Sequence, residues 1–224
     1  MPPNAIIADP ERALVLAYAP ARLRPALAAL WRLDERLGSV VAAAREPMIG
    51  AIRLAWWREA LEALDREPPP PEPLLKEIAE VLLPVGIAGA ELARIEAGWA
   101  PLLAGDPPNE EAIGQHGQLR GRPLFAIAAR LLAGAESREA EIAGEGWALA
   151  DLASRLSDPG AAALAKAKSA ECLGRLREFR WPRPLRPVGI LAVLARHDAN
   201  SRRARRQGSP ARLARGLFLG VTGR

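Results

Sequence analysis

The chain has 224 residues, half of them hydrophobic, and a formal net charge of +5. Its length suits one substantial core and a single domain. The single cysteine, Cys172, excludes an internal disulfide and fits a reducing compartment. No apolar run approaches the ~18–20 residues of a membrane span. Residues 1–9 lack the basic start and apolar stretch of a signal peptide, so we expect a cytoplasmic location.

The predicted elements are all helical, because Ala, Leu, Arg and Glu recur throughout and β-branched residues do not alternate with polar ones. Asp9-Pro10 is typical of a helix start, and many of the 21 prolines fall where helices should end. A proline-rich loop is expected at 67–73. In chain order, helices are expected at residues 10–18, 21–44, 46–65, 74–83, 88–103, 109–133, 137–157, 161–179 and 187–196. The sequence therefore predicts an all-α fold packed around one core.

The charge is concentrated at the end of the chain. Residues 196–224 contain eight arginines and one acid, which gives +7 and leaves −2 for residues 1–195. We expect a helical domain over 1–195 and a basic, partly helical tail over 196–224. The tail also carries a Leu217-Phe218-Leu219 cluster, a combination that suits an anionic membrane surface or an acidic protein partner. A disordered basic end is the alternative. Nucleic acid is not expected, because aromatic residues do not alternate with the arginines.

One acid lies on the apolar face of the second predicted helix. Leucines and a valine repeat there at spacings of three, four and seven, and Asp34 falls in the same series, with Glu35 at its border. A carboxylate in a core needs a paired cation or a metal. We therefore expect Asp34 to be buried against an arginine, with Arg53 of the next helix as the first choice. The alternative is that it lines a polar cavity.

The same region resembles the squalene/phytoene synthase family. The helix around Asp34, the Glu46-Pro47 loop, Gly50 and the string Arg53-Leu-Ala-Trp-Trp-Arg58 follow in the family's order. The resemblance extends over residues 11–160 and weakens beyond. It is similar to the divergent branch that includes a mitochondrial respiratory complex I assembly factor. It implies a helical bundle of the isoprenoid (trans-prenyl) synthase type, truncated towards the C-terminus.

The resemblance also implies where a magnesium site would lie. In catalytic members two aspartate-rich motifs face each other and hold Mg²⁺ against prenyl diphosphates, because this ion needs several converging carboxylates. Asp34 matches the first acid of the first motif, but Gly38 stands at the second. Glu35 is a substitute candidate.

The second motif is expected at the end of the helix over 137–157. Ser157 and Ala161 stand where its acids belong, and Asp151 and Asp158 are present but out of register. Asp151 is also placed to form an intrahelical pair with Arg155. The Tyr-Leu-Pro loop of catalytic members is absent. The resemblance thus predicts loss of synthase activity.

Three arginines are candidates for a cavity or diphosphate site: Arg53, Arg120 and Arg122. For the last two, a solvated helix start is the alternative. His116 and His197 are expected at the surface or as caps, because one cysteine and two distant histidines form no zinc site.

Three functions follow from the sequence. The first is a non-catalytic, synthase-like assembly or scaffold factor near a membrane, with no cofactor expected. The second is an active prenyl transferase that condenses two farnesyl or geranylgeranyl diphosphates with Mg²⁺ and NADPH. The third is an isoprenoid- or lipid-binding protein.

Overall fold

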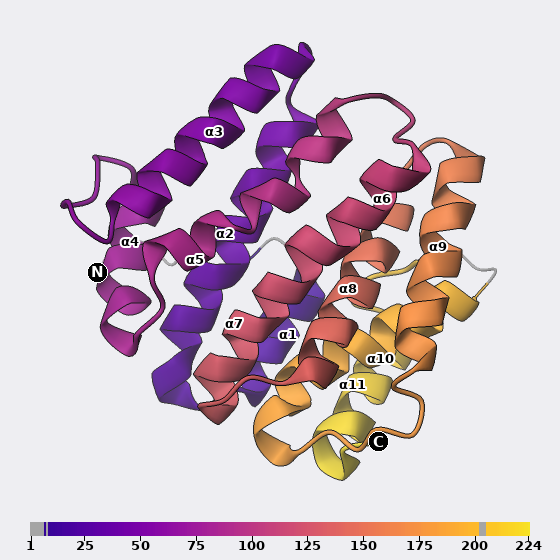
Figure 1. Ribbon diagram of the computed structural model, residues 1–224. Helices are drawn as coiled ribbons and strands as arrows, with labels where there is room; N and C mark the ends of the chain where they lie inside the picture. The colour runs from indigo at the N-terminus through magenta and orange to yellow at the C-terminus, as the bar shows by residue number, and fades with distance from the viewer. Residues whose placement is uncertain (1–6, 8, 202–204) are drawn as a thin grey trace.

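The computed structural model describes residues 7, 9–201 and 205–224, and these residues form helices and turns without a β-strand. The all-α prediction is confirmed. Most of the longer helices run side by side, and the N-terminal and C-terminal helices lie on the same side of the bundle (Figure 1). The α-helices are α1 (Pro10–Tyr18), α2 (Arg24–Ala42), α3 (Pro47–Ala63), α4 (Pro73–Val81), α5 (Gly89–Ala93), α6 (Glu110–His116), α7 (Arg122–Ala133), α8 (Arg138–Ala153), α9 (Pro159–Gly174), α10 (Arg186–Asn200) and α11 (Pro210–Thr222).

Part of the sequence interpretation lies outside the described residues. This applies to most of the segment over 1–9, for which no signal peptide is expected, and to Arg202 and Arg203 of the basic tail. Among the described helices, none is both long enough and apolar enough to cross a membrane.

The core is centred on α8, in which every residue from 143 to 152 is buried. Trp147 of this helix packs against Phe125 of α7 and Trp31 of α2, with ring centroids 5.3 and 6.3 Å away. Trp31 and Phe125 meet edge to face at 6.0 Å. Such aromatic contacts fill space efficiently and favour offset or edge geometry. The three side chains therefore close the space between α2, α7 and α8.

Helix starts follow the expected local chemistry. Asp9 accepts hydrogen bonds from the first backbone N–H groups of α1, and Asp158 accepts one from Ala161 N at the start of α9. Asn109 and Ser137 cap α6 and α8 in the same way. Each cap satisfies an N–H group that has no partner within its helix.

The prediction of one continuous helix over 88–103 is wrong. Only α5 is α-helical there, and two 3₁₀ turns follow, η3 (Glu96–Gly98) and η4 (Ala100–Leu103). The reason is a close approach: a Cβ built on Gly98 would lie 2.2 Å from the backbone nitrogen of Arg120. Pro101 also cannot donate a helical hydrogen bond.

The helix expected over 109–133 is interrupted by one π turn, η5 (Gly117–Gly121), between α6 and α7. This turn packs tightly on α8, where a Cβ on Gly121 would lie 2.2 Å from the carbonyl oxygen of Gly144. Single π turns shift the side-chain register of a helix and occur often at functional sites. Here the turn contains Arg120, whose side chain is buried.

The tail is partly helical, as expected, but it is not separate from the core. Leu219 of α11 is fully buried, so this helix covers part of the apolar core. Arg212 is also buried, and Gly220 packs against the ring of Tyr18 in α1. The helix thus contributes to the fold rather than extending from it.

Candidate functional site

Asp34 of α2 lies at the centre of a buried polar network. Its side chain is fully buried and accepts two hydrogen bonds from Arg120, Nε to Oδ1 and Nη2 to Oδ2, each 2.8 Å. Arg12 of α1 adds a third bond of 2.7 Å to Oδ2, and Trp99 Nε1 donates to Oδ1 at 3.2 Å. The prediction that Asp34 is buried against an arginine is confirmed. The choice of Arg53 as its partner is wrong, because Arg53 is exposed on α3.

Arg120 also bonds the second acid-bearing helix. Its Nη2 donates to Asp151 Oδ2 of α8 at 3.0 Å, so one guanidinium joins Asp34 and Asp151. The expected intrahelical pair between Asp151 and Arg155 is confirmed at 3.2 Å. Arg205, which follows α10, donates to Asp151 Oδ1 at 3.3 Å. All four carboxylate oxygens of the two acids are therefore occupied by N–H donors.

His116 of α6 completes the surroundings of Arg120. Its Nε2 lies 3.0 Å from Arg120 Nη1, and its Nδ1 lies 2.7 Å from the carbonyl oxygen of Gly98. An arginine can only donate, so Nε2 accepts and Nδ1 carries the proton that is donated to Gly98. The expectation of a surface histidine is wrong for His116, which is fully buried.

The electrostatics of the site follow from burial and from the arginines. Burial by itself raises the pKa of Asp34, but the charges of Arg120 and Arg12 outweigh it and lower the pKa to about 2. The pKa of Asp151 is lowered by the same opposition of burial and the charges of Arg120 and Arg155. Burial and the charge of Arg120 lower the pKa of His116 to about 3. The histidine is thus neutral and both acids are ionised at neutral pH.

Aromatic rings shield the network from water. The guanidinium carbon of Arg120 lies 4.2 Å from the ring centroid of Trp99 and 4.8 Å from that of Trp147. The guanidinium of Arg12 stacks over Trp147 at 4.9 Å. Cation–π contacts of this kind are strongest where water is excluded.

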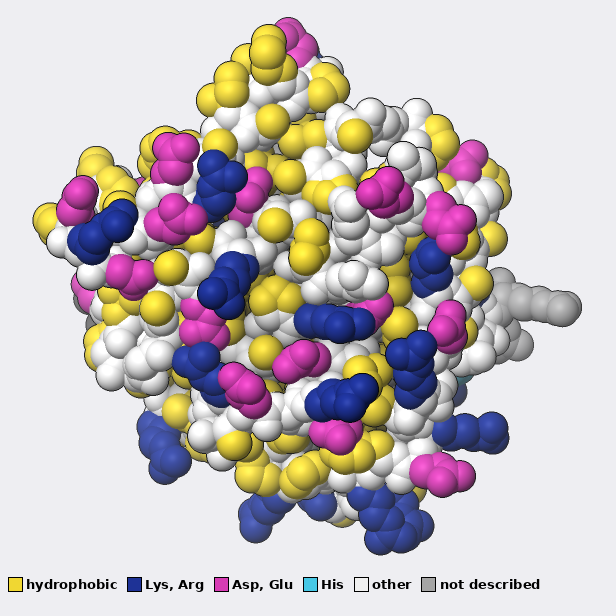
Figure 2. Space-filling view, in the orientation of Figure 1, with side chains coloured by type: hydrophobic (Ala, Val, Ile, Leu, Met, Phe, Trp, Pro, Cys, Tyr) yellow, Lys and Arg dark blue, Asp and Glu magenta, His cyan; other side chains and the backbone are white. Residues whose placement is uncertain are grey.

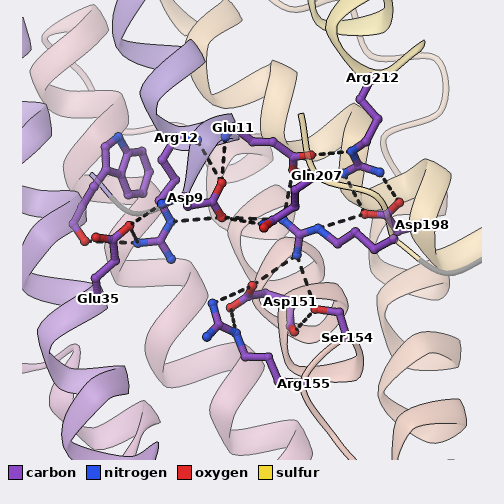
Figure 3. A network of polar contacts seen from close by, with 12 residues as sticks. Asp9, Glu11, Arg12, Glu35, Asp151, Ser154, Arg155, Asp198, Gln207 and Arg212 are labelled. Carbon is purple, nitrogen blue, oxygen red and sulfur yellow. Dashed lines mark hydrogen bonds and ion pairs between the residues drawn. The ribbon is translucent and has the colours of Figure 1, made fainter. Parts of the chain in front are cut away.

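A second group of ion pairs connects the N-terminal and C-terminal helices. Arg212 of α11 lies between Glu11 of α1 and Asp198 of α10, and donates to both carboxylates (Figure 3). Arg205 donates to Glu11 Oε2 at 3.0 Å as well as to Asp151. The polar interior is therefore continuous from α2 to α11.

The other predicted site residues have separate structural roles. Glu35 accepts from Asp9 N at 3.3 Å and lies 3.7 Å from Arg12 Nη1. Asp158 is the cap of α9 and does not join Asp34 or Asp151. Arg122 pairs with Glu145 at 2.6 Å and is 44% exposed, so the alternative of a solvated helix start is right for Arg122. The same alternative is wrong for Arg120, which is buried.

The sequence interpretation missed Arg12, Trp99, Arg205 and Arg212. A signal existed for Arg12, because it falls three and seven residues before Val15 and Ala19, which are also buried. Trp99 and the two tail arginines follow breaks in the helical pattern. Periodicity cannot predict there which side chains point into the core.

The residues present do not fit a magnesium ion. The position that matches the second acid of the first motif is Gly38, and a Cβ there would lie 2.7 Å from the Trp99 ring. Asp34 and Asp151 already bind an arginine between them. Among the described residues, no three or more His, Cys, Asp or Glu side chains form a group able to hold a metal ion. Mg²⁺ is usually held by one or two carboxylates together with water and phosphate oxygens, and here both acids are already bound by arginines.

Comparison with known proteins finds one family that part of the chain resembles. Residues 8–108 match the squalene/phytoene synthase family model. This segment, which includes Asp34 and Gly38, is similar to the squalene/phytoene synthase family, and the all-helical architecture of the described residues agrees with the helical fold of that family. No curated protein and no solved structure matches the chain.

Proposed function

We propose that this protein is a non-catalytic member of the squalene/phytoene synthase family that acts as an assembly or scaffold factor near a membrane. The observation that carries the proposal is the position of Arg120, whose guanidinium is bound by both Asp34 and Asp151. Synthase chemistry needs metal-bound diphosphate between two acid-bearing helices. Here a fixed cation neutralises the acids instead, and displacing it would leave a buried charge at high cost.

The packed centre of the bundle gives further support. Trp31, Phe125 and Trp147 occupy the space between α2, α7 and α8. A prenyl chain of fifteen or twenty carbons would have to displace these rings. The same packing disfavours the alternative of an isoprenoid-binding protein.

The scaffold role is supported by an exposed apolar face on α3, which projects at the top of Figure 1. Met48, Ile52 and Trp56 follow each other at four-residue spacing and are 69%, 60% and 46% exposed. Hydrophobic side chains gather on this part of the surface in Figure 2. Exposed apolar patches of this kind mark protein–protein interaction sites. The resemblance to the branch with a complex I assembly factor leads us to propose a membrane-associated protein complex as the client.

Catalysis and scaffolding can be separated with purified protein. We expect no release of diphosphate from farnesyl or geranylgeranyl diphosphate, with or without Mg²⁺ and NADPH, and no heat of Mg²⁺ binding in calorimetry. Magnesium-dependent release that is abolished by Asp34→Asn, in a variant shown to be folded by circular dichroism, would establish the alternative of an active prenyl transferase.

The scaffold role is tested in cells that lack the protein. We expect a lower amount of one assembled membrane complex on native gels, restored by the wild-type chain but not by Met48→Ser with Ile52→Ser. Leu119→Ser, at an isolated exposed leucine, is the matched control and should restore assembly. Unchanged complexes in the deletion cells would refute the role.

A further inference from the structure

Helix α11 presents most of its large apolar side chains to the solvent. Leu217, Phe218 and Val221 are 54%, 61% and 74% exposed, and Leu213 continues the same stripe one turn earlier. Surface helices of globular proteins usually turn this face to the core. The inward face of α11 instead carries Arg212, Gly216, Leu219 and Gly220.

The orientation of α11 is fixed by specific contacts. Cβ atoms built on Gly216 and Gly220 would lie 3.2 Å from Ile190 and 2.4 Å from the Tyr18 ring, so only a glycine face can approach α10 and α1 this closely. Arg186 also donates to the carbonyl oxygens of Gly220 and Val221 at 3.0 Å. A rotated helix would lose these contacts together with the ion pairs of Arg212. The outward apolar stripe is therefore a property of the folded state.

An arginine-lined groove lies beside this stripe, between α9, α10 and α11. One part, of about 530 Å³, is lined by three arginines with His197 and Asn200 and by no acid. The adjoining part, of about 290 Å³, adds two more arginines and one acid, Glu178. The five arginines of the groove are Arg177, Arg180, Arg196, Arg215 and Arg224. Such a concentration of guanidinium groups attracts phosphate groups.

Apart from Arg212, which is buried against Glu11 and Asp198, the charged side chains of α11 and of the residues after it have one sign. Residues 209–224 contain three arginines and neither Asp nor Glu. Lys and Arg side chains gather along the lower edge of the molecule in Figure 2, where Figure 1 places α11. An apolar stripe bordered by arginines is complementary to one surface in particular, a bilayer with acyl chains below a layer of phosphates.

We propose that α11 and the adjoining arginine groove dock the protein on an anionic phospholipid bilayer. The helix lies in the plane of the membrane, Leu217, Phe218 and Val221 enter the acyl region, and the groove arginines bind lipid phosphates. This inference rests on the proposed function for its biological role, because it names the surface at which the scaffold works. It replaces the general expectation of a basic tail with a folded site that includes Arg177 and Arg180 of the preceding segment.

The test is co-sedimentation of the full chain with vesicles. We expect binding to phosphatidylcholine vesicles that contain phosphatidylglycerol, and little binding to phosphatidylcholine alone. Phe218→Ser with Val221→Ser should abolish it, and Arg177→Gln with Arg180→Gln should weaken it roughly thirtyfold, since two arginines at about 1 kcal/mol each near an anionic surface contribute about 2 kcal/mol. Higher salt should weaken binding by the intact protein.

Matched controls separate specific docking through α11 from non-specific hydrophobic binding to vesicles. Met48→Ser with Ile52→Ser removes equally exposed apolar side chains from α3 and should leave vesicle binding unchanged. Inorganic phosphate at millimolar concentration should weaken binding no more than the loss of Arg177 and Arg180 does, because it offers no acyl layer to Phe218 and Val221. Equal binding by the α11 variant and wild type, or an equal loss in the α3 variant, would overturn the proposal.

The two proposals fail in different ways. Absence of vesicle binding together with absence of diphosphate release removes the membrane surface and leaves the non-catalytic assignment. Vesicle binding together with magnesium-dependent diphosphate release removes the non-catalytic assignment and leaves the membrane surface.

Discussion

Arg120 binds Asp34 with two parallel hydrogen bonds of 2.8 Å, and the Nη2 that makes one of them also donates to Asp151 at 3.0 Å. Bidentate pairs of this kind are the strongest hydrogen bonds that side chains form. The arrangement makes the protein supply its own cation between α2 and α8. Its charge balance therefore does not depend on a dissolved ion.

Removing the carboxylate of Asp34 should be strongly destabilising. Asp34→Ala leaves Arg120 and Arg12 buried with a missing partner, and we expect a loss of about 3–5 kcal/mol in the free energy of unfolding. Urea denaturation followed by circular dichroism measures it. The control is Asp158→Ala, which removes only a helix cap and should cost about 1 kcal/mol. Similar losses in the two variants would contradict the buried role of Asp34.

Restoring the missing acid should not restore a metal site. Gly38→Asp places a side chain where the ring of Trp99 lies 2.7 Å from the Cβ position. We expect a loss of about 1–3 kcal/mol from overpacking and no Mg²⁺ binding by calorimetry. Gly38→Ala, which adds the same Cβ without the charge, is the control and should lose a similar amount. Magnesium binding by the aspartate variant alone would show that the site is still competent.

The stability of the protein should fall in acid in two stages. His116 is neutral when folded because its pKa is lowered from 6.5 to about 3. The unfolded chain binds that proton first, so stability is complete above pH 6.5 and declines below it, by on the order of 3–5 kcal/mol at pH 3. The pKa of Asp34 is lowered from 3.8 to about 2, so its contribution is lost as the pH falls from about 4 towards 2.

Denaturation curves between pH 7 and pH 3 measure the first stage, and His116→Gln should flatten it. NMR provides an independent check, because the chain has only two histidines. The signal of His197 should titrate below its usual pKa, which burial and the charge of Arg215 lower. The signal of His116 should stay constant down to about pH 4. A titration of both near pH 6.5 would show that His116 is solvated.

Loss of Arg212 should destabilise the whole fold rather than release a tail. Arg212→Leu leaves Glu11 buried without this partner, and we expect a cost of about 3–5 kcal/mol in unfolding free energy. Arg215→Leu, on the same helix, is the control and should change stability little. Thermal unfolding by circular dichroism compares the two. An unchanged transition in Arg212→Leu would mean that α11 can leave the core at no cost.

The inner face of α2 could be predicted from the sequence because leucines and Asp34 share one helical period. The partner of Asp34 could not, because Arg120 is 86 residues away and a π turn sets its direction. Arg53 was misassigned for a related reason. An apolar helix that is exposed on one side has the same composition as one buried on all sides, and α3 is of the first kind.

The pair between Glu11 and Arg212 joins residues 201 positions apart, and this separation affects how the chain is made. During synthesis α1 emerges early, but the two cations that pair with Glu11, Arg205 and Arg212, emerge only near the end of the chain. Contacts between distant residues also slow folding, because the intervening loop must close first. We therefore expect the growing chain to remain incompletely packed on the ribosome until α11 is released, and to depend on chaperones that bind exposed apolar segments during that interval.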